Sequence, residues 1–307
     1  MSNPDLSPTS VVIHLARESA RLRSLTWSKS TLPGVRRALT HRRTARMLRT
    51  TMTMTTQQAG LPHMKRSSLP YLGRSMARHF GVELSRARAS SSLLPLHLYQ
   101  LFKQRDINIV LDVGARHGEF GTLLRRNGYR GRIVSFEPVA SNYTILREAS
   151  VQDPLWTSMH LALGSKDGAA DINVTHGSMF SSFFPPNDYS LTTFGALPSV
   201  ALTESVPVKK LDTLFDNLIA ETPDPHVYLK MDTQGFDLEV LKGASGCLDR
   251  IVGMQSEVAV RKIYDDAPSM FESIDAILGY GFLISGMFPV TLDNGLRVIE
   301  FDCVAVR

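Results

Sequence analysis

The sequence predicts an α/β protein with a doubly wound, mostly parallel sheet and an antiparallel C-terminal hairpin. From about residue 93 onward, short β-branched runs alternate with helical segments, the pattern of parallel strands joined by crossover helices. Near the end of the chain, two apolar runs flank Asp293, Asn294 and Gly295, a combination typical of a hairpin turn. The hairpin predicts an antiparallel edge on the parallel sheet.

The first predicted elements form two strand–helix units. The leucine-rich stretch Leu93–Phe102 predicts a short packing helix with Pro95 in its first turn. The β-branched run Ile107–Val113 predicts a buried strand, and residues 118–127 predict a helix with one apolar face. Residues Arg132–Phe136 predict the second strand.

The next stretch departs from this regularity. Residues 141–149 predict a helix with Ser141 as its N-cap, and residues 157–163 predict a third strand. Residues 164–205 are rich in Gly, Ser, Phe and Pro and predict a hairpin followed by a long irregular loop. Long loops on a rigid scaffold often carry function, so we expect this segment to bind the substrate.

Regular alternation then resumes to the end of the chain. The remaining predicted elements are a strand at 227–232, a helix at 237–243, a strand at 251–257, a helix at 269–279 and strands at about 282–288 and 297–306. Ser269 is the predicted N-cap of the last helix, and Gly281 follows its end.

Charge divides the chain into two regions. Residues 1–100 carry a net charge of +13, whereas residues 101–307 carry −8, which together give +5. A uniformly basic nucleic-acid-binding protein is therefore excluded. Residues 1–88, rich in Arg, Ser and Thr, predict a disordered or loosely helical extension. The folded domain is predicted at 89–307.

Three further interpretations of the N-terminal region stand beside disorder. Translation could start at Met64, the region could be an organellar transit peptide, or it could contact an anionic membrane or nucleic acid. No apolar run reaches the roughly 18 residues that span a membrane, and a continuous signal-peptide core is missing. We expect a cytoplasmic protein, or an organellar one if the transit interpretation holds.

The cysteine and histidine pattern excludes two further classes. Cys247 and Cys303 are the two cysteines, which excludes a disulfide scaffold and a cysteine-rich zinc site. We expect both to be small buried apolar residues. No His/Asp cluster has ligand spacing, so no metal is expected.

The most informative stretch is Asp112–Gly118, on the turn between the first strand and the first helix. Open α/β sheets bind ligands at the carboxyl ends of their strands, so a cofactor is expected here. A dinucleotide fingerprint would require glycine at two further positions, which are occupied by Arg116 and Glu119. The turn therefore does not fit a pyrophosphate.

S-adenosylmethionine fits the turn better because it carries an ammonium, a sulfonium and a ribose diol but no phosphate. Asp112 can face the positive charge, and Gly114 and Gly118 let the backbone approach the methionine part. Glu137, at the end of the second strand, can accept hydrogen bonds from both ribose hydroxyls. Asn142 either orients the adenosine or stabilises the helix start.

Four motifs, in this order, resemble those of the FkbM-type methyltransferases. They are Leu111–Gly118, Phe136–Asn142, Ala162–Gly168, and Leu229–Asp237 together with Leu241–Gly243. The resemblance runs from about Ile107 to Glu257, and more loosely to the C-terminus. It implies the Rossmann-like fold of class I methyltransferases and S-adenosylmethionine as cofactor. It also adds Ala115 and Leu163 to the expected cofactor site.

The chain departs from the family pattern at two places. Arg116 stands where the family usually has Asn, and Phe236 with Asp237 stands where it often has Glu. Arg116 brings a cation near a cationic cofactor, so it is expected to tilt outward or to meet an acidic substrate group. The role of Asp237 is left open.

Methyl transfer to a hydroxyl requires positioning and removal of the hydroxyl proton. Asp232, after the fourth main strand, is the preferred base, although it could also be an acid on the cofactor side. Glu257 and His117 are weaker candidates. Lys230 shares a strand face with Asp232 and is expected to lower the pKa of that carboxyl.

These observations together predict an O-methyltransferase acting on a hydroxyl of a small molecule or glycan. The Asn/Asp-Pro-Pro-aromatic motif of adenine N-methyltransferases is missing at the fourth strand, where Met231–Gln234 stands. Two alternatives stay open. One is a nicotinamide-dependent oxidoreductase, and the other is a non-catalytic Rossmann-like binding module.

Overall fold

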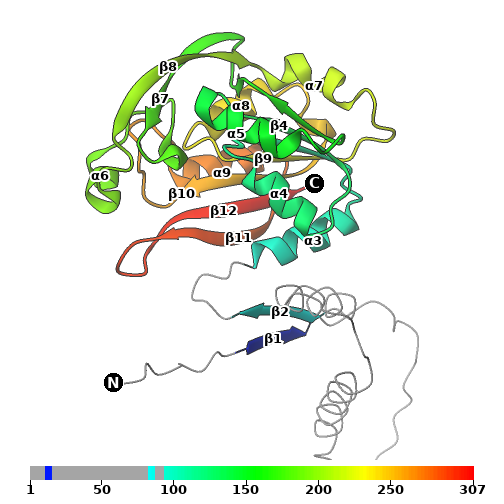
Figure 1. Cartoon of the computed structure of the whole chain (residues 1–307). Helices are drawn as coiled ribbons and strands as arrows, with labels where there is room; N and C mark the ends of the chain where they lie inside the picture. Colours follow the sequence, from blue (N-terminus) through cyan, green and yellow to red (C-terminus); the bar gives the residue numbers. More distant parts are fainter. Residues whose placement is uncertain (1–10, 16–81, 87–92) are drawn as a thin grey trace, which may run out of the picture. The chain divides into compact units, whose positions relative to one another are not determined.

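The computed structural model describes residues 11–15, 82–86 and 93–307 (Figure 1). The chain divides into two units between Ser91 and Ser92. In the first unit, β1 (Val11–Leu15) and β2 (Val82–Arg86) form an antiparallel pair. The rest of the predicted extension at 1–88, including the Met64 region, lies outside the described residues.

A seven-stranded sheet organises the second unit, with the strand order β11-β12-β10-β9-β3-β4-β5 (Figure 1). The strands are β3 (Ile109–Val113), β4 (Arg132–Phe136), β5 (Trp156–Met159), β9 (Val227–Met231), β10 (Ile251–Ala259), β11 (Leu283–Leu292) and β12 (Val298–Val306). The neighbours β10, β9, β3, β4 and β5 are parallel, and β12 runs antiparallel between β10 and β11. The predicted fold class is confirmed.

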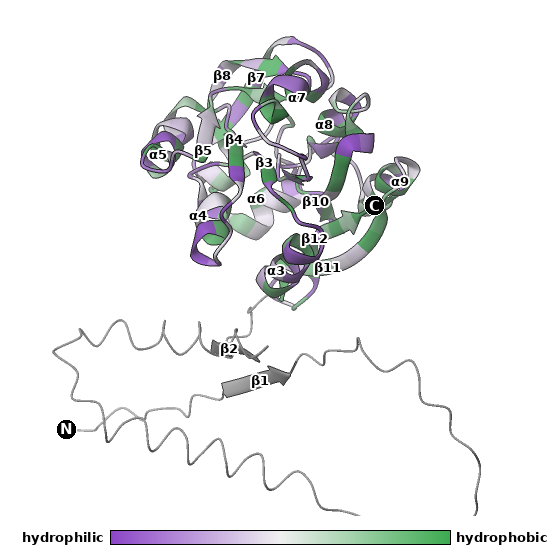
Figure 2. Ribbon diagram, turned by 90° about the vertical axis from the view of Figure 1, so that its right-hand side faces the viewer, coloured by the Kyte–Doolittle hydropathy of each residue, from purple (hydrophilic) through white to green (hydrophobic). Residues whose placement is uncertain are grey.

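Helices cover both faces of this sheet because side chains alternate along its strands. Ile109 and Leu111 of β3 point to one face of the sheet and pack in a core with three helices. Val110 points to the opposite face and packs in a second core with three other helices. The first set is α7 (Leu211–Ile219), α8 (Asp237–Gly243) and α9 (Met270–Gly279); the second is α3 (Leu94–Gln104), α4 (Glu119–Arg126) and α5 (Ala140–Ser150). Figure 2 shows the central strands β3 and β10 mostly in hydrophobic green.

A second, three-stranded sheet has the order β6-β8-β7 and is built from β6 (Ala162–Leu163), β7 (Gly168–Thr175) and β8 (Val200–Lys209). The predicted strand at 157–163 is therefore wrong in its second half, since β5 ends at Met159. The chain turns at His160, whose ring bonds to the Pro138 carbonyl at 3.0 Å and stacks on Tyr143. These contacts divert the chain from one sheet to the other.

The segment predicted as a hairpin and irregular loop is more regular than expected. Strands β7 and β8 form the hairpin, and the loop between them contains α6 (Asp188–Phe194). The side chain of Asn187 caps this helix by accepting from the Ser190 N–H at 3.0 Å. Helix α7 was not predicted, although Leu211, Phe215 and Leu218 recur at helical spacing and are buried.

Of the two predicted helix caps, one is confirmed and one is wrong. Ser269 caps α9 in a capping box with Glu272, as predicted. Ser141 is not a cap, because α5 begins at Ala140 and its first N–H groups bond to glutamate side chains instead. The strand predicted at about 282–288 continues to Leu292 in β11, and β12 matches its predicted range within one residue. Cys247 and Cys303 are buried and free, as expected.

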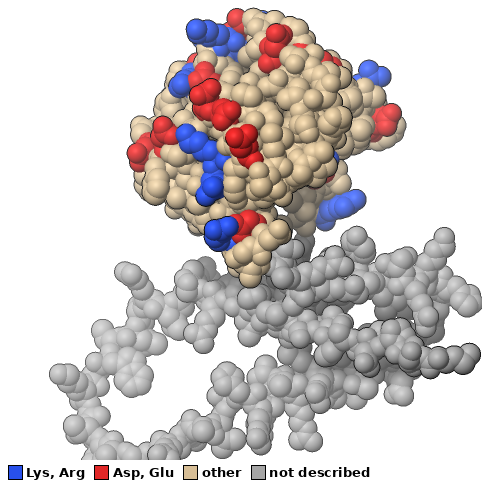
Figure 3. Space-filling view, turned by 90° about the vertical axis from the view of Figure 1, so that its left-hand side faces the viewer, with Lys and Arg blue, Asp and Glu red and all other residues tan. Residues whose placement is uncertain are grey.

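Two properties of the described residues concern charge and membranes. On the face shown in Figure 3, acidic and basic side chains of the second unit are interspersed. None of the helices in the described part of the chain combines the length and apolar character needed to cross a bilayer.

Candidate active site

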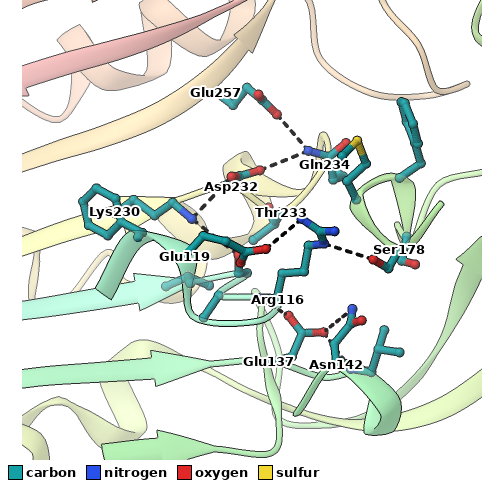
Figure 4. A pocket seen from close by; sticks show the side chains of 18 of the residues that line it. Arg116, Glu119, Glu137, Asn142, Ser178, Lys230, Asp232, Thr233, Gln234 and Glu257 are labelled. Carbon is teal, nitrogen blue, oxygen red and sulfur yellow. Dashed lines mark hydrogen bonds and ion pairs between the residues drawn. The ribbon is translucent and has the colours of Figure 1, made fainter. Parts of the chain in front are cut away.

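A cavity of about 590 Å³ lies at the carboxyl ends of β3, β4, β9 and β10. Among the predicted site residues, those that line it are Gly114, Ala115, Glu137, Asn142, Leu163, Asp232 and Glu257. Asp112, Gly118 and His117 do not line it. Figure 4 shows charged and amide side chains from several strands converging on this space.

Glu137, which follows β4, is buried and held by three N–H groups. One oxygen accepts from the Arg116 main chain at 2.7 Å. The other accepts from the Val139 main chain at 3.0 Å and from the Asn142 side chain at 3.3 Å. Burial raises the pKa of this carboxyl to about 7, and the three donors oppose that rise. The carboxylate is thus fixed in place while facing the cavity.

Asn142 connects Glu137 to the turn after β3. Its amide nitrogen donates to Glu137, and its oxygen lies 3.2 Å from the His117 ring nitrogen. Asn142 is buried and lines the cavity, and its side chain links Glu137 to His117. His117 supports this arrangement from outside the cavity and is not placed to remove a substrate proton.

Asp112 lies beneath the cavity, fully buried on the sheet face of α3–α5. Its carboxylate is 3.1 Å from the Lys230 ammonium and accepts from the Ser135 hydroxyl at 3.1 Å. The prediction placed this carboxylate beside the cofactor. The alternation of side chains along β3 instead turns it toward the helices, on the same face as Val110.

Lys230 reaches the cavity in place of Asp112. Its ammonium lies 3.4 Å from Asp232, and it also donates to the Gly114 carbonyl at 3.4 Å. Burial opposes its charge, but Asp112 and Asp232 outweigh that effect and raise the pKa of the ammonium. Lys230 therefore remains a cation at the floor of the cavity.

The two glycines of the turn serve packing. Gly114 has a φ of +75°, and a Cβ there would overlap the carbonyl oxygen of Asp232. Glycine thus permits the turn after β3 to touch the chain after β9. Gly118 has a φ of +81°, and a Cβ there would lie 3.0 Å from Leu146 and 3.1 Å from Trp156. Gly118 lies outside the cavity lining and permits close packing at the start of α4, so its approach to the cofactor stays a prediction.

Asp232 and Glu257 are joined by an amide that sequence reasoning missed. The Gln234 side-chain nitrogen lies 3.0 Å from Asp232 and 2.9 Å from Glu257 (Figure 4). The side chain of Asp232 is 39% exposed. Burial and the neighbouring acids, Glu300 first, raise the pKa of the Glu257 carboxyl well above its ordinary value.

Two more acids face the same end of the cavity from β12. Asp302 pairs directly with Glu257 in the sheet register, and Glu300 pairs with Ala259. Burial is the main cause that raises the pKa of Glu300 to about 7 and that of Asp302 to about 6. The sequence held a signal for them, because acids at alternating positions of an apolar strand share one face.

Asp237, whose role was left open, lies outside the cavity lining and joins two strand ends. It is buried at the start of α8 and accepts from the Thr233 main chain at 2.9 Å. It also accepts from the Ser256 hydroxyl at 2.6 Å and the Glu257 main chain at 3.2 Å. These bonds hold the ends of β9 and β10 together.

The segment between β7 and β8 forms a wall of the cavity. Its lining side chains include Met179, Phe180, Phe183, Phe194 and Leu197. Arg116 donates to the Ser178 hydroxyl of this wall at 3.0 Å and pairs with Glu119 at 2.8 Å. The guanidinium therefore bonds to the protein at the edge of the cavity. No metal-binding group of three or more His, Cys, Asp or Glu occurs among residues 93–307.

Comparison with known proteins gives solved structures that are similar to this chain. Methyltransferase FkbM from Methylobacillus flagellatus KT is 16% identical, with a TM-score of 0.42; the match covers 66% of this chain and 44% of that one. The O-methyltransferase from Bacillus cereus in complex with SAH is 13% identical, with a TM-score of 0.41, covering 84% and 97%. This chain therefore spans less than half the length of the Methylobacillus protein.

No curated protein matches the chain in sequence. A family model described as the methyltransferase FkbM domain matches residues 112–284. This match covers more than half of the 307 residues and includes the β3 turn, Glu137 and the ends of β9 and β10. The chain belongs to the FkbM family of S-adenosylmethionine-dependent methyltransferases.

Proposed function

We propose that this protein transfers a methyl group from S-adenosylmethionine to a hydroxyl of a small molecule or glycan. One observation carries the proposal. Glu137, fixed by three N–H groups, faces the same cavity as the carboxylate pair Asp232 and Glu257. The cavity thus has a ligand for a diol at one end and acceptors for a proton at the other.

The residues at the β4 end fit the cofactor. A carboxylate whose position is fixed by protein donors keeps further lone pairs for two neighbouring hydroxyls, which matches a ribose. Ala115, Asn142 and Leu163 line the space beside it. When bound, S-adenosylmethionine supplies a methyl group already activated by its sulfonium. Asp112 acts from below by holding Lys230 in its charged form.

The residues at the β9 and β10 end fit a hydroxyl acceptor. Asp232 and Glu257 accept the hydroxyl proton as a pair, while Lys230 balances the charge of Asp232. The wall between β7 and β8 places apolar and aromatic side chains over the acceptor and keeps water away.

We propose that residues 89–307 form the complete catalytic domain. Every residue that lines the described cavity lies at or after Leu94. That the extension at 1–88 takes no part in catalysis stays a prediction, as do its contact with nucleic acid or membrane and a cytoplasmic location. Family membership disfavours the nicotinamide-dependent oxidoreductase and the binding module.

Titration calorimetry on the full chain tests the cofactor assignment. We expect heat with S-adenosylmethionine and S-adenosylhomocysteine and none with NAD; heat with NAD alone would contradict the proposal. Transfer of labelled methyl to sugars and hydroxylated metabolites tests the reaction. The double variant Asp232→Asn, Glu257→Gln should keep cofactor binding and lose transfer about 100-fold or more.

A further inference from the structure

We propose that Gln234, oriented by Tyr264, is a positioning residue that joins Asp232 and Glu257 into one proton-accepting unit. The inference deepens the proposed function, because it rests on the assignment of these two carboxylates to the hydroxyl proton. It concerns how the pair is held in the protein, which can be observed without knowing the acceptor.

The geometry of the amide carries the inference. A primary amide nitrogen has two N–H groups, and the two carboxylate oxygens lie 3.0 and 2.9 Å from it. Each carboxylate therefore receives its own N–H. The oxygen of each carboxyl that faces the amide accepts from it, so the amide turns its nitrogen toward both and its oxygen away.

The other side of the amide fixes the same orientation. The Tyr264 hydroxyl lies 2.7 Å from the Gln234 side-chain oxygen and 3.0 Å from the Phe180 carbonyl, so its single proton serves two acceptors. Tyr264 is buried and its ring packs in a cluster with Phe180 and Ile263. A rigid aromatic residue thus holds the amide against rotation.

The main chain of Gln234 has a left-handed conformation that few residues other than glycine adopt. Its φ is +54°, and Gly235 follows with a φ of +91°. The Ser182 hydroxyl donates to the Gln234 carbonyl at 2.7 Å and stabilises this turn. Backbone conformations of this kind persist where surrounding contacts require them, and here they direct the amide between the two strand ends.

The pair is not symmetrical, because the charged groups around it differ. The titratable groups that face it are Lys230 on β9, Asp237 on α8, Glu300 and Asp302 on β12, and Tyr264 after β10. Asp232 has both the ammonium and the amide as partners, whereas Glu257 has the amide and faces acids. A proton taken up by the unit therefore rests on Glu257.

Carboxyl NMR titration of the full chain, with Asp and Glu labelled at the side-chain carboxyl carbon, tests the inference. Asp232→Asn and Glu257→Gln identify the two signals. In Gln234→Leu both carboxylates lose an N–H donor, so both apparent pKa values should rise by about one unit. A rise at only one carboxyl, or at neither, would overturn the joining role.

Two further variants keep the test decisive. Tyr264→Phe retains the packed ring but removes the bond that orients the amide, and it should give a smaller rise at both carboxyls; no rise would overturn the orienting role of Tyr264. Ser182→Ala removes the bonds to the Gln234 carbonyl and from the Phe184 N–H but none to the Gln234 side chain, so it should shift the two values less than Tyr264→Phe does; a shift as large would overturn the orienting role of Tyr264. Calorimetry of the wild type with S-adenosylhomocysteine is the separate arm. Lack of binding there counts against the proposed function, while the titration still reports on Gln234.

Discussion

The two ends of the cavity each place a glutamate near a strand end, but they hold it by different means. Glu137 receives three N–H groups, two of them from the main chain, and all from residues 116–142. Glu257 receives a side-chain N–H from Gln234 and faces Glu300 and Asp302. Glu137 is thus held mainly by main-chain donors, whereas Glu257 is held by a side chain from a separate segment.

The contrast shows which end can vary. Main-chain donors are the same for every sequence that forms the turn, so the Glu137 end depends on the fold itself. Side-chain donors and opposing acids depend on particular residues, so the Glu257 end can change by substitution. Repulsion among its acids costs stability, which points to a role in binding or chemistry.

The largest loss of stability is expected at Gly114, where the turn after β3 contacts the chain after β9. Gly114→Ala would place a Cβ on the carbonyl oxygen of Asp232 and force the β3 turn away from β9. We expect it to lower the free energy of unfolding by about 3 kcal/mol or more, measured by urea denaturation. The matched control is Gly128→Ala, where φ is +92° and nothing lies within 4 Å of the added Cβ.

That control should cost about 1 kcal/mol through its backbone conformation alone. Equal losses in the two variants would show that contact between the ends is not what Gly114 protects.

The next effect tests the backbone-held end. Glu137→Gln retains the shape of the side chain but gives it an amide group that opposes the Arg116 and Val139 N–H donors. The affinity for S-adenosylhomocysteine should weaken about 100-fold, as measured by calorimetry. Glu204→Gln is the control, because Glu204 also accepts from the start of α5, at 3.3 Å from Ala140, but lies outside the cavity lining. A similar loss of affinity in both variants would show that Glu137 has no special role in binding S-adenosylhomocysteine.

The smallest effect tests the side-chain-held end and depends on pH. The pKa of Glu300 is raised to about 7 in the folded chain, so folding favours its protonated form. Its contribution to stability is present at low pH and is lost as pH rises from about 4.5 to about 7. Glu300→Gln should therefore raise the free energy of unfolding by about 2 kcal/mol at pH 8 and leave it unchanged near pH 4.

Urea denaturation at both pH values measures this effect, and exposed Glu148→Gln serves as the control. A gain of similar size at pH 4 would show that repulsion among the acids is not its cause.

The same contrast explains how much the sequence could predict. The β3 turn, Glu137 and Asn142 lie within about 30 residues, and their positions follow from strand ends and helix starts. The fold class and most elements were predictable for this reason. Gln234 and Tyr264 bond to each other across 30 positions of the sequence, and Glu257 lies opposite Asp302 in the antiparallel register of β10 and β12. Such meetings depend on packing, which a local pattern does not specify.

Asp112 is a residue whose position in the fold was predicted but whose side-chain direction was not. Its place at a strand end was predicted correctly, but alternation along β3 sends its carboxylate to Lys230 beneath the cavity. The strand alternation was available in the sequence. What a local pattern could not give was the pairing of β3 with β9, which places Lys230 directly beside Asp112.

At His160 the chain leaves the seven-stranded sheet for the three-stranded one. The wall between β7 and β8 and the strand ends at the cavity therefore depend on different sheets. Residues between β7 and β8 hang from their own small sheet, so insertions or deletions there leave the pairing of β3, β4 and β9 intact. A change in the length or sequence of this wall would therefore alter one side of the cavity and leave the strand ends that carry Glu137 and Asp232 in place.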